Sequence, residues 1–252
     1  MPLQVITVPC LKDNFAFLAH DPDSGATAVV DVPEAAPILK ALDDRGWRAT
    51  DVLLTHHHAD HVQGLAALQA GLAAPVRVTG AAADAHRLPP LDRAVSPGDS
   101  VMVGGVEGRV IDVSGHTVGH VAYAFPGVAF TGDSLMALGC GRLFEGTAQM
   151  MWDSLMRLAA LPPDTRICSG HDYLDGNLAF ARSVEPDNAA ADARLTHARQ
   201  KGAEAVHVTL DEERASNPFL RAALPEVKAA LRLAGASDSE TFAELRRRKD
   251  AF

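Results

Sequence analysis

The segment at residues 53–64, LLTHHHADHVQG, places four histidines and one aspartate within six positions, directly after an apolar run. Imidazole nitrogens and carboxylate oxygens are ligands for Zn²⁺ and related ions, whereas a solvated histidine-rich turn needs no partners elsewhere. His56 and His58 are one residue apart, so in an extended chain their side chains leave on the same side. Asp60 and His61 follow where a helix should begin. The segment predicts half of a metal site, and other parts of the chain must supply the rest.

Three later segments repeat a pattern of an apolar run, small residues and then a potential ligand. VIDVSGHTVGH ends in His116 and His120, VAFTGDSL contains Asp133, and TRICSGH ends in His171. Ligands of layered α/β proteins commonly lie at such strand ends. His120 could replace His116 as a ligand only if their loop were helical, and the glycines at 115 and 119 argue against a helix. We therefore expect these strand ends to meet the 56–61 segment.

The number of donors predicts the number of metal ions. A single tetrahedral zinc ion uses three or four ligands, so seven donors imply two ions that share one ligand. The two oxygens of Asp133 make it the natural bridge. The mixed nitrogen and oxygen set suits zinc, our first expectation, but iron and manganese remain open. The seven expected ligands are His56, His58, Asp60, His61, His116, Asp133 and His171.

The remaining histidines are expected to have other roles. His57 alternates away from its neighbours, so we interpret it as a support for the site rather than as a ligand. No partners in sequence accompany four others, which we expect at the surface: His20, His86, His197 and His207.

Composition bounds the class of protein. The chain has 252 residues, 47% hydrophobic and 22% charged, as is usual for a globular protein with a sizeable core. A formal net charge of −9 argues against nucleic acid or an anionic membrane as the main partner. Three scattered cysteines predict no disulfide framework. We find neither a signal peptide nor an apolar run of about 18 residues, so we expect a cytoplasmic protein. We also expect a monomer.

Apolar periodicity predicts a mixed α/β domain at residues 1–172 and a helical domain at 173–252. In the first, helices are expected at 33–45, around 65–72 and at 147–160. In the second, they are expected near 177–184, 188–202, 224–235 and 238–252, the last with a capping box of Ser237 and Glu240. Strands are expected at 3–8, 15–20, 26–31, 51–55, 76–80, 100–105, 108–113, 120–125, 127–133 and 165–171.

Several motifs carry a family resemblance. THHHADH, HTVGH, TGD and SGHDY resemble the motif series of the metallo-β-lactamase superfamily, whose fold is a four-layer αββα sandwich. GCGRLFEGT, RSVEPDN, SNPFLR and LRRRKDAF resemble the glyoxalase II, or hydroxyacylglutathione hydrolase, family. This second resemblance runs essentially from end to end and includes the helical C-terminal part.

The resemblance implies hydrolysis of the thioester S-D-lactoylglutathione to glutathione and D-lactate. In that interpretation His56, His58 and His116 hold one ion, and Asp60, His61 and His171 hold the other. Two such ions activate a bridging hydroxide as the nucleophile, which Asp60 and Asp133 would help to position. The glutathione thiolate is a good leaving group, so no dedicated general acid is expected.

The resemblance also implies the substrate-binding residues. Arg246 and Lys249, three apart on one helix, match residues that bind the glycine carboxylate of glutathione, although basic residues are also common at helix C-termini. Phe144 stands where the family commonly has tyrosine, so one hydrogen bond worth about 0.5–1.5 kcal/mol is expected to be missing. The other matching positions are Arg142, Tyr173 and, for the peptide backbone, Asn177.

Three alternatives stay open at this point. A glutathione persulfide dioxygenase would share the fold and use a single iron, held by His56, His116 and Asp133. A generic thioesterase or lactonase of the superfamily would need no glutathione site. A non-catalytic metal-binding or interaction module would use the same ligands without turnover.

Overall fold

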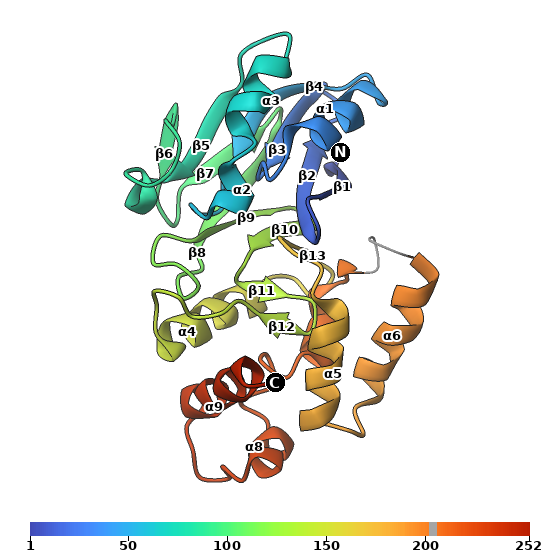
Figure 1. Ribbon diagram of the computed structural model, residues 1–252, viewed down its shortest axis with the longest axis vertical. Coiled ribbons are helices and arrows are strands. Elements are labelled where there is room, and N and C mark those ends of the chain that lie inside the picture. Colours follow the sequence, from blue (N-terminus) through green and yellow to red (C-terminus); the bar gives the residue numbers. More distant parts are fainter. Residues whose placement is uncertain (202–205) are drawn as a thin grey trace.

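Two β-sheets are stacked face to face in the computed structural model of the chain, which describes residues 1–201 and 206–252 (Figure 1). For residues 195 and 197–201 it describes the backbone alone. The strands of the first sheet follow one another in chain order, antiparallel from β1 to β3 and parallel from β3 to β6. They are β1 (Gln4–Cys10), β2 (Asn14–His20), β3 (Ala26–Val30), β4 (Arg48–Leu53), β5 (Arg77–Ala81) and β6 (Arg93–Val95).

The second sheet has the order β13-β10-β9-β8-β7. Its first pair is parallel and the others are antiparallel. These strands are β7 (Ser100–Val103), β8 (Val106–Asp112), β9 (Val121–Phe125), β10 (Val128–Gly132) and β13 (Arg166–Ser169). A small hairpin of β11 (Leu135–Met136) and β12 (Gly139–Cys140) follows β10.

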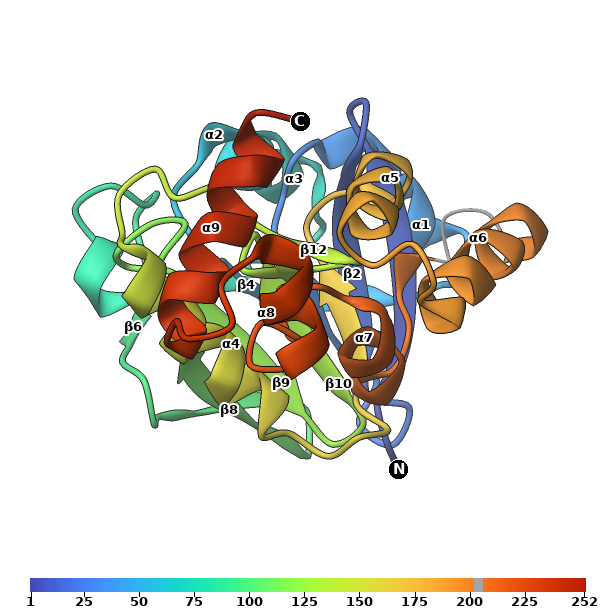
Figure 2. The same cartoon turned by 90° about the horizontal axis from the view of Figure 1, so that it is seen from below.

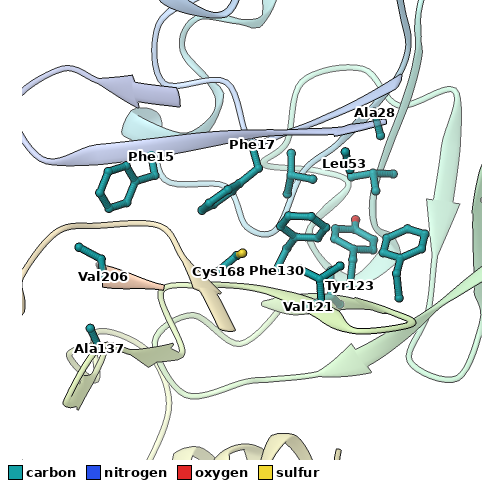
Figure 3. Close-up of a cluster of buried hydrophobic side chains, with 14 of the residues drawn as sticks. Phe15, Phe17, Ala28, Leu53, Val121, Tyr123, Phe130, Ala137, Cys168 and Val206 are labelled. Atoms are coloured by element: carbon teal, nitrogen blue, oxygen red, sulfur yellow. The ribbon is translucent and has the colours of Figure 1, made fainter. Parts of the chain in front are cut away.

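Apolar side chains from the facing sides of both sheets form the central core (Figure 3). Phe17 of β2 packs on Phe130 of β10 with ring centroids 5.4 Å apart. Every residue of β2 is buried, because the second sheet covers one of its faces and helices cover the other. Burial on both faces explains why this strand is a nearly continuous apolar run rather than an alternating one.

Helices cover the outer face of the first sheet. Ile38 and Leu42 are four residues apart on α1 (Ala35–Asp43) and pack with Leu68 against the first sheet. The other helices of this part are α2 (Ala59–Val62), α3 (Leu65–Gly71) and the short 3₁₀ helix at Ala82–Asp84.

The outer face of the second sheet is covered by α4 and the C-terminal helices (Figure 2). Leu155 of α4, Phe180 of α5 and Phe242 of α9 belong to one apolar cluster with Ala129 and Ile167 of the sheet. These helices are α4 (Ala148–Ala159), α5 (Leu174–Val184), α7 (Leu210–Ser216), α8 (Pro225–Leu231) and α9 (Asp238–Asp250). The helix α6 (Ala189–Lys201) lies to one side, and its buried Ala191 belongs to the central core. The predicted four-layer αββα arrangement with a helical C-terminal part is therefore confirmed.

Most predicted elements are present, and their ends follow local chemistry. The Thr147 hydroxyl accepts from the Met150 amide at the start of α4, and Ser237 and Glu240 form the predicted capping box. The prediction missed β6, the β11–β12 hairpin, the 3₁₀ helix at Ala82–Asp84 and the separate short helix α2. It also missed α7, which begins with its own capping box at Thr209 and Glu212. The end of the helix expected at 188–202 lies outside the described residues. Within the described part of the chain, no helix is both long and apolar enough to span a bilayer.

One buried hydrogen bond ties the sheets together beside the histidine-rich segment. The hydroxyl of Tyr123 on β9 donates to the backbone oxygen of Leu54, 2.8 Å away. Tyr123→Phe should lower the free energy of unfolding by about 1–3 kcal/mol, because this change leaves a buried carbonyl oxygen unpaired. Urea unfolding would measure the loss. The half-exposed Tyr173 provides a matched control, since Tyr173→Phe should change stability by less than about 0.5 kcal/mol.

Candidate metal centre

The expected ligands gather where strands of both sheets end. His56 and His58 follow β4, and Asp60 and His61 lie on the short helix α2 that comes next. The other three each follow a strand of the second sheet: His116 after β8, Asp133 after β10 and His171 after β13.

The expected ligands form two groups, each with its ligand atoms within 4.8 Å of one another, and the unpredicted Asp31 forms a third such group with His56 and His61. The first consists of His56, His58 and His116, in which Nδ1 of His58 and Nε2 of His116 are 3.0 Å apart. The second consists of Asp60, His61 and His171, in which Nε2 of His171 lies 3.3 Å from both His61 Nε2 and Asp60 Oδ2.

Asp133 lies between the two groups. Its Oδ1 is 3.3 Å from Nε2 of His61, and its Oδ2 is 3.3 Å from Nε2 of His171 and 3.4 Å from Nε2 of His116. One carboxylate thus reaches histidines of both groups, as the expected bridge must.

The donor atoms fit divalent cations. Nε2 of His56 and Oδ1 of Asp133 are buried and have no hydrogen-bond partner among the described residues. Buried polar atoms are rarely left unpaired unless another ligand completes them. Histidine and carboxylate donors in this number suit zinc or a similar metal.

The charge states of the ligand side chains also favour a bound cation. Burial raises the pKa of Asp133, but His61 and His171 outweigh it and hold the pKa well below its ordinary range. Burial and the neighbouring His61 and His120 lower the pKa of His56, so its imidazole is neutral and its nitrogen lone pair is available. Burial opposes protonation of His61, yet Asp133 and Asp31 raise its pKa, which indicates an excess of negative charge.

Two glycines allow the loops to meet this closely. Gly132, before Asp133, has φ of 48°, and a Cβ there would lie 2.6 Å from Oγ1 of Thr55. A Cβ on Gly170 would lie 2.6 Å from Oδ1 of Asp133. The TGD and SGH motifs therefore need glycine for close approach.

His57 and His120 are placed as supports. His57 Nδ1 lies 2.9 Å from Oδ2 of the buried Asp84, which also binds Arg87. His120 stacks on His56 with ring centroids 4.6 Å apart, and its Nε2 accepts from the Asp133 amide at 3.0 Å. This bond occupies the ring nitrogen of His120 that faces the centre, so His116 is the better ligand of the two.

A pocket of about 830 Å³ opens over the centre and extends to the C-terminal helices. Its size suits a small organic ligand. Besides residues of the metal centre, all six predicted substrate-binding residues line it: Arg142, Phe144, Tyr173, Asn177, Arg246 and Lys249.

These six residues are differently placed within the pocket. The exposed ring of Phe144 packs edge-on against the rings of His58 and His116, and Tyr173 stacks on His171. Arg142 is exposed, and its Nε lies 4.0 Å from Oδ1 of Asp250. Three others have closer protein partners. Arg246 is only 5% exposed and bonds Cys140 O and Asp250, Lys249 donates to Gly176 O, and Asn177 donates to Ala137 O.

Comparison with known proteins identifies the family. Residues 23–171 match the model of the metallo-beta-lactamase superfamily, and residues 172–252 match that of the hydroxyacylglutathione hydrolase C-terminus. Hydroxyacylglutathione hydrolases of Fuscovulum blasticum and Cereibacter sphaeroides are 62% and 59% identical to this chain over the full length of both partners. The chain belongs to the hydroxyacylglutathione hydrolase family. The centre accordingly binds divalent metal ions.

Solved structures share the fold. ETHE1 from Myxococcus xanthus is 25% identical with a TM-score of 0.67, and the match covers 98% of this chain and 90% of that one. The BLEG-1 B3 metallo-beta-lactamase is 20% identical with the same TM-score, over 86% of this chain and 99% of that one.

Sequence reasoning missed the groups that orient the ligands of this hydrolase fold. Asp31 accepts from the Thr55 amide and hydroxyl and lies 2.8 Å from Nδ1 of His61. Both its oxygens are thereby engaged, so we interpret Asp31 as an orienting residue although it lies close enough to be a ligand. Asp13 similarly lies 3.0 Å from Nδ1 of His171. The strand-end position of Asp31 after AVV could have revealed it.

Two histidines expected at the surface are buried, and that prediction was wrong. His20 stacks on Trp47 and bonds Thr27, and His207 lies against the rings of Phe15 and Phe17. Aromatic neighbours distant in sequence cover both imidazoles. His86 is exposed as expected, and the side chain of His197 lies outside the described residues.

Replacing Asp31 should weaken metal binding without removing a ligand. Asp31→Asn keeps the shape and tolerates the observed φ of 54°, but it removes the negative charge beside His61. Metal affinity should fall about 10–100-fold in a chelator competition assay. The matched change Asp92→Asn, away from the centre, should leave metal affinity unaltered; equal losses in both variants would contradict the orienting role.

Proposed function

We propose that this chain hydrolyses the thioester S-D-lactoylglutathione to glutathione and D-lactate. Membership of the hydroxyacylglutathione hydrolase family supports the reaction class. One observation carries the proposal: two donor groups that share Asp133 open into a pocket that is also lined by Arg142, Arg246 and Lys249. One end of such a site suits an acyl group and the other suits an anionic carrier.

The metal ligands proposed are those of the two donor groups. His56, His58 and His116 would hold one ion, Asp60, His61 and His171 the other, and Asp133 both, with zinc as the expected metal. When bound, such ions lower the pKa of water towards neutrality and polarise the carbonyl under attack.

The protein's own groups keep the donors aligned. The amide nitrogen of Asn14 donates to Oδ2 of Asp60 at 3.0 Å, which fixes this half-buried carboxylate. The backbone amide of Asp133 donates to His120, and its carboxylate lies among three imidazoles. We infer that Asp60 and Asp133 position the attacking oxygen. Because a thiolate is a good leaving group, no side chain needs to donate a proton to it.

Substrate orientation follows from the two ends of the pocket. The rings of Phe144 and Tyr173 lie against ligand histidines, so we infer that they border the acyl group. Lys249 and the exposed Arg142 would bind carboxylates of glutathione. The guanidinium of Arg246 already binds Cys140 O and Asp250. Arg246 would therefore stabilise this part of the pocket and add positive charge to it.

A single-iron dioxygenase explains fewer of the donors. Such an enzyme needs only His56, His116 and Asp133. It does not explain why the ligand atoms of Asp60, His61 and His171 lie as close together as those of the His56 group. A metal-binding module without catalysis would likewise not need a pocket lined by cations beside the centre.

Removal of metal should abolish hydrolysis. Dialysis against a chelator should lower turnover of S-D-lactoylglutathione about a hundredfold or more, because water without a metal is a poor nucleophile at neutral pH. Activity should return when two equivalents of Zn²⁺ per chain are added. Metal analysis of the same sample would measure how many ions are bound. Full activity at one equivalent, or oxygen uptake with glutathione persulfide, would contradict the proposal.

Loss of a pocket cation should weaken substrate binding more than chemistry. Lys249→Ala and Arg142→Ala should each raise KM for S-D-lactoylglutathione about tenfold, the cost of one charge-assisted hydrogen bond, with kcat within about twofold. Arg247→Ala is the matched control, because Arg247 is exposed on the same helix and pairs with Glu244. An unchanged KM in the two pocket variants would indicate a thioesterase or lactonase without a glutathione site.

A further inference from the structure

The ammonium group of Lys249 lies beside two aromatic rings. Its Nζ is 5.5 Å from the ring centroid of Phe180 on α5 and 5.4 Å from that of Phe252, just beyond α9. The two rings meet edge to face with centroids 5.6 Å apart. Nζ also donates to the backbone oxygen of Gly176 at 2.7 Å. A long flexible side chain is thus held in one place at the pocket wall.

The two rings differ in what holds them. Phe180 is 1% exposed and belongs to the apolar core beneath the C-terminal helices. Phe252 is 65% exposed and lines the pocket. An exposed ring contributes little apolar burial, so core packing does not account for its position. Its ring contacts are with Phe180 and with the ammonium of Lys249.

Lys249 needs such support because its surroundings are cationic. Burial and the nearby Arg246 and Arg142 lower the pKa of Lys249. The neighbouring carboxylate of Asp250 is engaged by Arg246 at 2.8 Å. An ammonium group has three N–H donors, and one is used on Gly176. The ring faces attract the cation without occupying the remaining donors, which leaves these for an anionic ligand.

We propose that Phe252 is a positioning residue for substrate binding: its ring holds the Lys249 ammonium where it can donate to a carboxylate of the substrate. This inference rests on the proposed function, in which Lys249 binds glutathione. Phe252 touches Lys249 and acts through it.

Steady-state kinetics with S-D-lactoylglutathione test the coupling of the two residues. Phe252→Ala should raise KM about threefold to fivefold with kcat unchanged, Phe252→Leu should do the same, and Phe252→Tyr should retain the wild-type value. In a Lys249→Ala background, Phe252→Ala should cause no further rise. An unchanged KM in Phe252→Ala, or effects that multiply in the double variant, would overturn the proposal.

A spectroscopic measurement separates this inference from the reaction itself. In protein labelled with ¹³C-lysine, the Hε protons of Lys249, assigned by their loss in Lys249→Ala, should be shifted upfield by the rings. The shift should shrink in Phe252→Ala and persist in Phe252→Tyr, while the melting temperature stays constant. Met102→Ala removes an exposed apolar side chain on β7 and should alter neither readout.

The two failures are distinguishable. A wild-type chain that does not turn over the thioester would contradict the proposed function, whatever the spectra show. A wild-type chain that is active, but whose Lys249 resonances are the same with and without the Phe252 ring, would contradict the positioning role alone.

Discussion

A buried carboxylate surrounded by imidazoles is the constraint on which this structure depends. Burying the charge of Asp133 is costly unless other groups compensate it. Compensation comes from His61, on the helix that follows a strand of the first sheet, and from His171, after a strand of the second sheet. The charge can therefore be tolerated only when the sheets are closed on each other. The same closure brings together the metal ligands that follow strands of the two sheets.

Hydrogen bonds to the ligand histidines, on the side away from the centre, hold these side chains in place. The nitrogens that face away from the centre are paired: His61 with Asp31, His171 with Asp13, and His116 with the backbone oxygen of Arg142. Each pairing fixes which nitrogen faces inward, because a neutral imidazole has one donor and one acceptor. The partners come from β1–β2, β3 and the segment after β12, so elements far apart in sequence share the alignment of one site.

Sequence patterns predicted the parts of this arrangement that are local. Strand-end donors such as His116 and Asp133 follow runs of apolar residues, and caps such as Ser237 mark helix starts within four residues. What the patterns could not predict depends on distant partners. Asp13 gains its role from a histidine 158 positions away, and His207 is buried by rings of β2. The engagement of Arg246 by Cys140 O, 106 residues away, was equally beyond local inference.

Because the chain is negatively charged overall, the pocket cations must bind an anionic substrate by direct contact. A net charge of −9 opposes the approach of an anionic substrate, yet Arg142, Arg246 and Lys249 line one wall. At physiological ionic strength, charges farther apart than about 8 Å are largely screened, so distant acidic residues neither attract nor repel strongly. Recognition is then decided by which donors point into the pocket. With Arg246 fixed by Asp250 and Cys140 O, that choice falls to Lys249 and Arg142, and therefore to the groups that hold Lys249 in place.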